Sequence, residues 1–374
     1  MDAAASTASR AGRTGRESGR EVVVLVNGAE HSALGERARW VGRAAGPGAT
    51  VAYRAGGRRH ALAAFVRRVR TERPRVVYLV DTALATVAAG AWARCRGARV
   101  ILDTGDATAA LTLATGRLGA LGRLGAPLFE RLAYAVAATV VVRSEELGRH
   151  VRSLADRPVV VVPDGFDPAR VDTSGGERLR QQWGVDAGGL VVGVLGAARW
   201  NARRRWCYGR DVIEAVAAAR RRDVVGAVLV RGDGLPRLRA LAERLQVTDR
   251  VIFAEPAEPL GWTQLAAVDV ALSTQTNDTV GRVRTTGKLV QYMAAGRFVL
   301  ASRVGAAAEL LPETMLVDYH GAWDEGYFAR LAQRLDALPD RRSLAEQGGR
   351  LRVVAEPFAY PQLVPTLSSV LGGA

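Results

Sequence analysis

The residue with the clearest chemical implication is Lys288, the only lysine among 52 basic residues. The segment 285–296 around it predicts a helix, with an apolar stripe and a glycine at its end. A helix N-terminus carries unpaired N–H groups and the positive end of the dipole, so an ammonium there is unfavourable unless an anion lies between them. Lys288 and the backbone at Thr286 and Gly287 therefore predict a phosphate site, the alternative being that this lysine has no special role.

A second cationic segment follows the strand at 190–194. After the glycine at 196 it contains four arginines within seven residues, Arg199, Arg203, Arg204 and Arg205. Because this cluster follows a strand end, we expect at least one arginine to contact phosphate, although a solvated arginine-rich surface is the alternative.

The loop 281–288, which contains Arg282, is not a P-loop. Five residues separate Gly281 from Gly287, and Leu289 replaces the hydroxyl residue that would hold magnesium. No Asp-x-Asp pair for a diphosphate-bound metal is present. We therefore expect no metal and no cofactor, with Arg and Lys neutralising the phosphates.

Polar residues also follow two strands in the first half of the chain. Asn27, Gly28 and His31 come after strand 22–26, while Asp103, Thr104 and Asp106 come after strand 100–102. One carboxylate, Asp106, suits a helix cap, and Asp103 could orient a substrate hydroxyl. The candidate catalytic residues are Asp103, Asp106 and His31, and the candidate acceptor-binding residues are Asn27, Gly28 and Thr104.

Buried apolar runs alternate with amphipathic stretches along the chain, which predicts an α/β fold with parallel sheets covered on both faces. Two such series, divided near 163–176, predict two doubly wound domains facing a central cleft. The expected strands are 22–26, 50–53, 76–80, 100–102, 139–142 and 159–162, then 190–194, 226–230, 251–254, 268–272 and 298–301. The expected helices include 34–42, 61–70, 128–136 and 362–371.

Composition excludes several classes of protein. The net charge of +15 comes from arginine spread along the whole chain, and aromatics are only 6%, so no nucleic-acid partner is expected. Cys95 and Cys207 lack neighbours at disulfide or zinc-ligand spacing, which favours a reducing cytoplasm. No transmembrane helix or secretion signal is expected, and residues 1–20 are predicted to form a disordered basic tail.

Two longer segments resemble the retaining glycosyltransferases of family four. The segment 162–167, Val-Pro-Asp-Gly-Phe-Asp, is close to the family's V-P-N-G-V-D. The segment 288–300, which begins Lys-Leu-Val-Gln-Tyr-Met-Ala-Ala-Gly, is close to its K-L-x-E-Y-M-A-A-G. The resemblance, from about residue 22 to 371, implies the GT-B fold, with two Rossmann-like domains, a nucleoside diphosphate sugar as donor and metal-independent transfer with retention. It implies an acceptor domain at 21–165, a donor domain at 166–356, and a final helix at 357–374 that packs on either domain.

The resemblance also assigns individual residues. It places Arg203 and Arg199 on the donor diphosphate, and makes Arg282, Thr286, Gly287, Lys288 and Gln291 the donor-binding set. It places base selection on backbone groups near Ala257 and Glu258. The chain departs from the family where many members have two glutamates, because Val283 and Gln291 stand at those positions.

The sequence leaves more than one kind of acceptor possible. An arginine-rich, alanine-rich composition resembles actinobacterial proteins and favours a soluble small molecule of specialised, antibiotic-type metabolism. The alternative is a lipid or cell-envelope acceptor, reached through a basic amphipathic stretch at 117–131 that contains Arg117, Leu118, Arg123 and Arg131. A non-catalytic nucleotide-binding or partner protein is the third hypothesis, because Val283 cannot replace a carboxylate.

Overall fold

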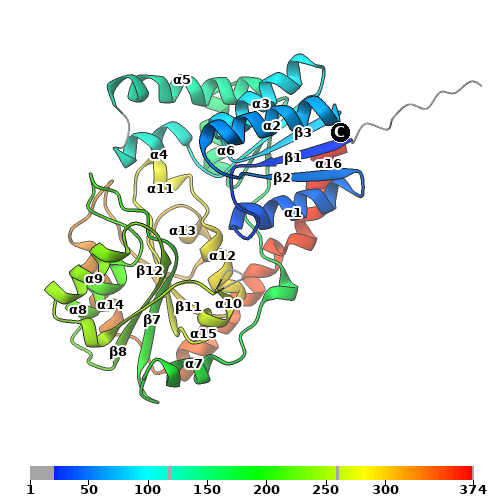
Figure 1. Cartoon of the computed structure of the whole chain (residues 1–374). Coiled ribbons are helices and arrows are strands. Elements are labelled where there is room, and N and C mark those ends of the chain that lie inside the picture. The colour runs from blue at the N-terminus through cyan, green and yellow to red at the C-terminus, as the bar shows by residue number, and fades with distance from the viewer. Residues whose placement is uncertain (1–20, 117–118, 258–260, 373–374) are drawn as a thin grey trace, which may run out of the picture.

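The computed structural model describes residues 21–116, 119–257 and 261–372, and Figure 1 shows two sheet-centred domains stacked one above the other. The expected tail at 1–20, together with Arg117, Leu118 and Glu258, lies outside the described residues.

The first domain is built on a six-stranded parallel sheet in the order β2-β1-β3-β4-β5-β6. Its central strands are valine- and leucine-rich and buried on both faces, as expected when helices cover both sides. The strands are β1 (Val22–Val26), β2 (Ala49–Tyr53), β3 (Val76–Val80), β4 (Arg99–Thr104), β5 (Thr139–Val142) and β6 (Val159–Val161). The helices are α1 (Ala33–Ala45), α2 (Arg58–Glu72), α3 (Leu84–Cys95), α4 (Thr108–Thr115), α5 (Ala120–Val136) and α6 (Glu145–Leu154).

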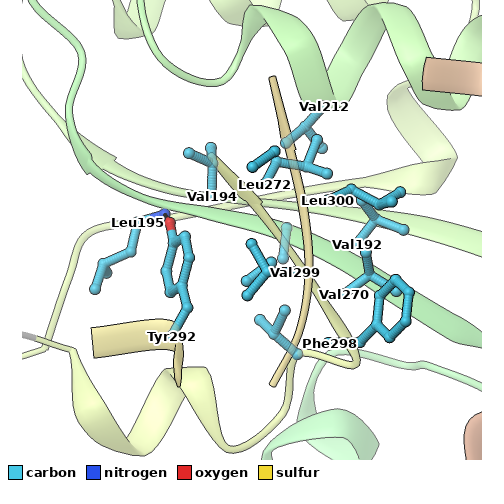
Figure 2. Packing of buried hydrophobic residues seen from close by; sticks show 14 of the residues in the cluster. Val192, Val194, Leu195, Val212, Val270, Leu272, Tyr292, Phe298, Val299 and Leu300 are labelled. Atoms are coloured by element: carbon cyan, nitrogen blue, oxygen red, sulfur yellow. Dashed lines mark hydrogen bonds between the residues drawn. The ribbon is translucent and has the colours of Figure 1, made fainter. Parts of the chain in front are cut away.

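The second domain has a parallel sheet in the order β12-β11-β10-β7-β8-β9, in which the strand order reverses between β7 and β10. Figure 2 shows part of its core, where side chains of β7, β10, β11 and two helices meet. The strands are β7 (Leu190–Ala197), β8 (Val224–Arg231), β9 (Val251–Ala254), β10 (Val270–Ser273), β11 (Phe298–Ser302) and β12 (Leu316–Val317). The helices are α7 (Gly176–Gln182), α8 (Arg210–Ala218), α9 (Leu235–Arg244), α10 (Trp262–Leu265), α11 (Thr279–Arg282), α12 (Gly287–Ala294), α13 (Ala306–Leu310), α14 (Tyr327–Asp336) and α15 (Arg341–Ala355).

The last helix, α16 (Tyr360–Gly372), returns to the first domain and packs beside α1. Its Leu363, Leu367 and Val370 join the buried cluster on one face of the first sheet, and Tyr360 stacks on Trp40 with ring centroids 5.4 Å apart. The chain therefore crosses between the domains twice, which ties them together at one end of the cleft.

The doubly wound architecture expected from the sequence is confirmed, and most strands begin and end within two residues of their predicted bounds. Three elements differ more. The two-residue strand β12 was not expected, β7 continues through the glycine turn to Ala197, and α5 begins at Ala120 rather than near Leu128. The early start of α5 was hidden by the two glycines within it, by Gly119 at its N-cap and by Pro127, because glycine and proline lower helix propensity.

Candidate functional site

A cleft of about 880 Å³ lies between the two domains, and residues of both line it. Its position agrees with the strand topology, because ligands in doubly wound sheets bind beyond the carboxyl ends of strands where the strand order reverses. In the second domain these ends are Gly196 in the last residues of β7 and Thr274 after β10, and both line the cleft. In the first domain, His31 after β1 and Asp81 after β3 do the same.

Lys288 lies in the first turn of α12 and lines the cleft. Its Nζ atom is buried and has no hydrogen-bond partner among the described residues. It lies 3.0 Å from the ring centroid of Tyr208, and burial lowers the pKa of Lys288 although the nearby Tyr208 and Asp211 oppose this. A buried ammonium satisfied only by a ring face has hydrogen-bonding capacity left for an anion.

The glycine turn at the end of β7 faces this ammonium. Gly196 has a φ of +149°, and a Cβ atom at this residue would lie 3.2 Å from Lys288 Nζ. Glycine therefore suits both the backbone conformation and the close approach of the turn to Lys288. The turn and the N-terminus of α12 form two sides of one small space.

A buried hydrogen bond holds these two sides together. The Leu195 N–H donates to the Tyr292 hydroxyl at 2.9 Å, as Figure 2 shows, and Tyr292 lies one helical turn after Lys288. Leu195 immediately precedes Gly196, so the bond fixes the end of β7 against α12. The sequence places this tyrosine next to Gln291 in the segment that resembles family four, and the structure explains why the segment needs it.

The remaining expected donor-side residues divide into two groups. Thr286, Gly287 and Gln291 line the cleft, and Thr286 is the N-cap of α12 but makes no side-chain capping hydrogen bond. Arg282, in contrast, is exposed and lies outside the lining.

The arginine-rich loop after β7 differs from its expected arrangement by one residue. Arg199 and Arg204 line the cleft, whereas Arg203 is exposed and does not. Arg204 is held by Asp278, with Nη2 and Oδ2 2.7 Å apart. The turn 201–206, closed by a pair of backbone hydrogen bonds between Asn201 and Trp206, sets which arginine points inward, and no local sequence signal reveals this register.

The same loop reaches the first domain. The Asn201 side chain donates to the Ala114 carbonyl of α4 at 3.1 Å, and Leu111, Ala114 and Thr115 of α4 line the cleft opposite the loop. The cleft is therefore bordered on this side by apolar and small residues of α4 and by Trp200 and Trp206.

Aromatic side chains gather in the cleft to an extent that the 6% aromatic composition did not suggest. Four of the seven tryptophans line it, together with tyrosines and a phenylalanine. The aromatic lining consists of Phe166, Trp200, Trp206, Tyr208, Trp262, Tyr319, Trp323 and Tyr360. Three of them, Trp200, Trp206 and Tyr208, belong to the loop that follows β7, and the others come from segments far apart in the sequence.

Asp103 occupies a different place from the one predicted. It is fully buried, and its carboxylate accepts hydrogen bonds from Arg37 Nε at 2.5 Å and from the Tyr78 hydroxyl at 2.8 Å. Arg37 in turn donates to the carbonyls of Val162 and Pro163 in the interdomain linker. The structure therefore corrects the expectation of a substrate contact, because Asp103 lies outside the cleft lining and anchors the linker through Arg37.

Asp106 lines the cleft, but it does not cap the following helix as expected. The N-cap of α4 is Ala107, with no side-chain cap, and Asp106 forms a two-bond ion pair with Arg284 of the second domain, at 2.6 and 3.2 Å. The arginine lies 178 residues away in sequence. A long-range partner of opposite charge therefore replaced the local capping contact.

Val283 explains why this ion pair crosses the cleft. Its side chain is buried within the hydrophobic cluster of the first domain, and its carbonyl accepts a hydrogen bond from the Ser144 hydroxyl at 2.8 Å. The position where many members of family four have a glutamate is therefore used here as an apolar contact between the domains.

Of the other first-domain candidates, only His31 lines the cleft. Thr104 is buried and its hydroxyl donates to the Asp106 carbonyl, while Asn27 donates to the Asp81 carboxylate at 2.8 Å. Gly28 lies beside Ser32 and Leu34, outside the lining. Asn27 and Thr104 therefore position the neighbouring acidic residues.

Asp81 is a cleft residue that the sequence reasoning missed. It follows β3 with a φ of +79°, and burial raises the pKa of its carboxyl although the Asn27 amide opposes this. A non-glycine residue in the left-handed region and a carboxyl with a raised pKa both occur frequently at functional sites. The sequence contained a signal for this residue, because Asp81 directly follows an apolar run, as Asp103 does.

The described residues contain neither a cluster of metal ligands nor a membrane-spanning helix. No group of three or more His, Cys, Asp or Glu side chains there could hold a metal ion. Nor is any helix in those parts of the chain long and apolar enough to cross a membrane.

Comparisons with known proteins agree with this geometry. Residues 191–335 match the family model for glycosyl transferases group 1, and no curated protein matches the chain. HepE from Anabaena, solved with UDP and glucose, is similar with a TM-score of 0.73 and 18% identity, over 95% of this chain and 100% of that one. Sucrose-phosphate synthase from Thermosynechococcus elongatus is similar with a TM-score of 0.72 and 15% identity, over 94% of this chain and 98% of that one. WaaG, a glycosyltransferase involved in lipopolysaccharide biosynthesis, is similar with a TM-score of 0.67 and 14% identity, over 94% of this chain and 100% of that one.

The two sheets, their strand order and these structural likenesses define the fold as GT-B. The residues that match the family model for glycosyl transferases group 1 lie in the second domain and include Lys288.

Proposed function

We propose that this protein is a retaining glycosyltransferase that moves a sugar from a UDP- or GDP-linked donor to an acceptor in the interdomain cleft. The observation that carries the proposal is the buried Nζ of Lys288, which has no hydrogen-bond partner among the described residues and faces both Gly196 and the start of α12. This is the arrangement that a diphosphate would complete, since the ammonium and the N–H groups of α12 would both bind it.

In this proposal, Lys288, Arg204 and the backbone at Gly287 stabilise the negative charge that builds on the departing diphosphate. Preorganised charges of this kind stabilise a transition state by several kcal/mol without requiring a metal. The bond between the sugar and the diphosphate breaks while the acceptor hydroxyl forms the new bond on the same face, and the leaving phosphate oxygen takes the acceptor proton. No metal or cofactor is part of the proposed reaction.

The first candidate acceptor is a soluble small molecule of specialised metabolism, handled in the cytoplasm. The free thiols of Cys95 and Cys207 agree with a reducing compartment. The aromatic lining of the cleft supports such an acceptor as well, because aromatic rings can pack against sugar rings and stack on planar groups. Asp81 and Asp106 are the carboxylates placed to bind acceptor or sugar hydroxyls.

The second candidate is an acceptor with an apolar tail at a membrane surface. The exposed leucines of α5 favour it, since α4, which packs against α5, contributes Leu111 and Ala114 to the cleft.

A thermal-shift experiment tests the donor site. UDP, GDP, TDP and ADP are added, with and without EDTA, to the wild type, to Lys288→Ala and to Arg282→Ala as a matched control outside the cleft. We expect one diphosphate to raise Tm in the wild type and in Arg282→Ala, independently of EDTA, and to lose its effect in Lys288→Ala. No shift with any diphosphate would remove the support for a donor site.

Turnover separates an enzyme from a non-catalytic nucleotide-binding protein. With the donor class known, slow release of diphosphate from the nucleotide sugar is measured, and the anomeric configuration of any product is read by proton NMR. Binding without donor hydrolysis or transfer to any acceptor would favour the non-catalytic alternative, and an inverted product would reject retention.

A further inference from the structure

Helix α5 exposes a row of large apolar side chains that no described part of the chain covers. The exposed fractions are 87% for Leu121, 78% for Leu124, 61% for Leu128 and 54% for Leu132. Their spacing of three, four and four residues places them on one side of the helix. Single exposed leucines are ordinary, but an uninterrupted row of four along one helix marks an interaction surface.

The opposite side of α5 is firmly attached to the domain. Ala126, Ala133 and Tyr134 are buried in it, and Arg94 donates to the carbonyls of Ala135 and Val136 at the end of the helix. An arginine at this end also complements the helix dipole. The leucine row is therefore the outer face of a well-anchored helix.

The charges on α5 indicate what covers the row. Its only acidic residue, Glu130, is buried and accepts a hydrogen bond from the Tyr134 hydroxyl. Its exposed charged residues are Arg123 and Arg131, on a chain with a net charge of +15. An apolar row flanked only by arginine complements an anionic lipid surface, where the leucines enter the acyl boundary and the arginines meet the headgroups.

We propose that α5 is an interfacial helix that docks the first domain on an anionic lipid surface. With 17 residues it is about 26 Å long and lies in the plane of the surface. Figure 1 shows α5 along the outer edge of the first domain, with α4 between it and α11 of the second domain. Docking brings the apolar wall formed by Leu111 and Ala114 close to the lipid, so an amphiphilic acceptor enters the cleft from the membrane, a consequence that rests on the proposed function.

Co-sedimentation of the full chain with vesicles tests the docking. The vesicles contain either phosphatidylcholine alone or phosphatidylcholine with phosphatidylglycerol. The variants are Leu124→Glu/Leu128→Glu, the milder Leu121→Glu, and Val353→Glu as a matched control, since Val353 is an aliphatic residue exposed to 68% on α15 of the second domain. We expect binding to the anionic vesicles only, at least about tenfold weaker in the double variant and unchanged in Val353→Glu.

Three results would overturn the proposal: no binding of the wild type to anionic vesicles, equal binding by the double variant, or a dimer of the wild type that the leucine substitutions dissociate while vesicles remain unbound. Light scattering detects the dimer. The diphosphate-induced rise in Tm, measured on the same proteins, shows that the variants are folded. It also separates a failure of docking from a failure of the proposed function, because vesicle binding needs no donor and no turnover.

Discussion

The two walls of the cleft differ in how their charged groups are paired. On the first-domain side the lining carboxylates of Asp106 and Asp81 bind Arg284 and Asn27, and the buried Asp103 behind them binds Arg37. Glu36 is the exception, since one oxygen of its carboxylate is buried without a hydrogen-bond partner among the described residues. On the second-domain side Lys288 has a buried ammonium without a hydrogen-bond partner among the described residues. A buried charge whose partner is present is compensated, whereas one whose partner is missing costs free energy that a ligand can recover. The paired groups of the first wall therefore fix positions in the fold, and the unpaired ammonium of the second is the group that we propose to bind an anion.

The largest effect on stability is expected from breaking the buried pair that lies behind the first wall. Asp103→Ala leaves Arg37 buried without its carboxylate, so we expect the free energy of unfolding to fall by about 3–5 kcal/mol. Urea denaturation measures it. Asp106→Ala is the control, because both side chains of its ion pair are about a quarter exposed and the expected loss is only about 1 kcal/mol. Equal losses in the two variants would show that the comparison between buried and exposed pairs is wrong.

On the second wall we expect the opposite pattern, with binding affected and folding spared. Lys288→Met keeps most of the apolar length of the side chain and removes the charge. The diphosphate affinity measured by calorimetry should fall roughly 100-fold, about 3 kcal/mol, while the free energy of unfolding without ligand stays the same or rises. A large loss of stability with unchanged affinity would mean that Lys288 is a structural residue.

The pH dependence of diphosphate affinity sharpens this result. Burial lowers the pKa of Lys288 below the ordinary lysine value, so its ammonium is lost as pH rises through that lowered pKa. The diphosphate is fully ionised above a pH of about 7, and arginine stays charged, so neither masks the change. We expect affinity to decline in the alkaline range, earlier than an unperturbed lysine would cause, and Lys288→Met to lack this decline. A flat profile in the wild type would contradict the lowered pKa.

The smallest effect is expected for the pair that joins the two walls. A double-mutant cycle with Arg284→Ala and Asp106→Ala should give a coupling of about 1 kcal/mol or less in the free energy of unfolding, since the pair is partly solvated. A coupling of several kcal/mol would mean that this pair, rather than the buried contacts, holds the domains together.

Local patterns were sufficient to predict the sheets and the helix that begins beside Lys288, because apolar runs and helix-end signals involve neighbouring residues. They were insufficient where a partner lies far away in the chain. Asp103 and its partner Arg37 are 66 residues apart, and Asp106 and Arg284 are 178 apart, so two carboxylates at one strand end were both predicted to be catalytic although their distant partners place them differently. The inward turn of Arg204 rather than Arg203 depends in the same way on Asp278 and on the loop geometry.

The burial of Val283 in the first domain also affects how easily the two domains can separate. If the domains separate to admit or discharge ligands, this side chain leaves an apolar environment, at a cost of about 1.5–3 kcal/mol. That cost alone favours the closed form by roughly ten- to a hundredfold. A glutamate at this position would be hydrated on opening, so for the proposed transferase the valine leads us to expect that departure of the spent nucleotide, rather than bond making, limits each cycle.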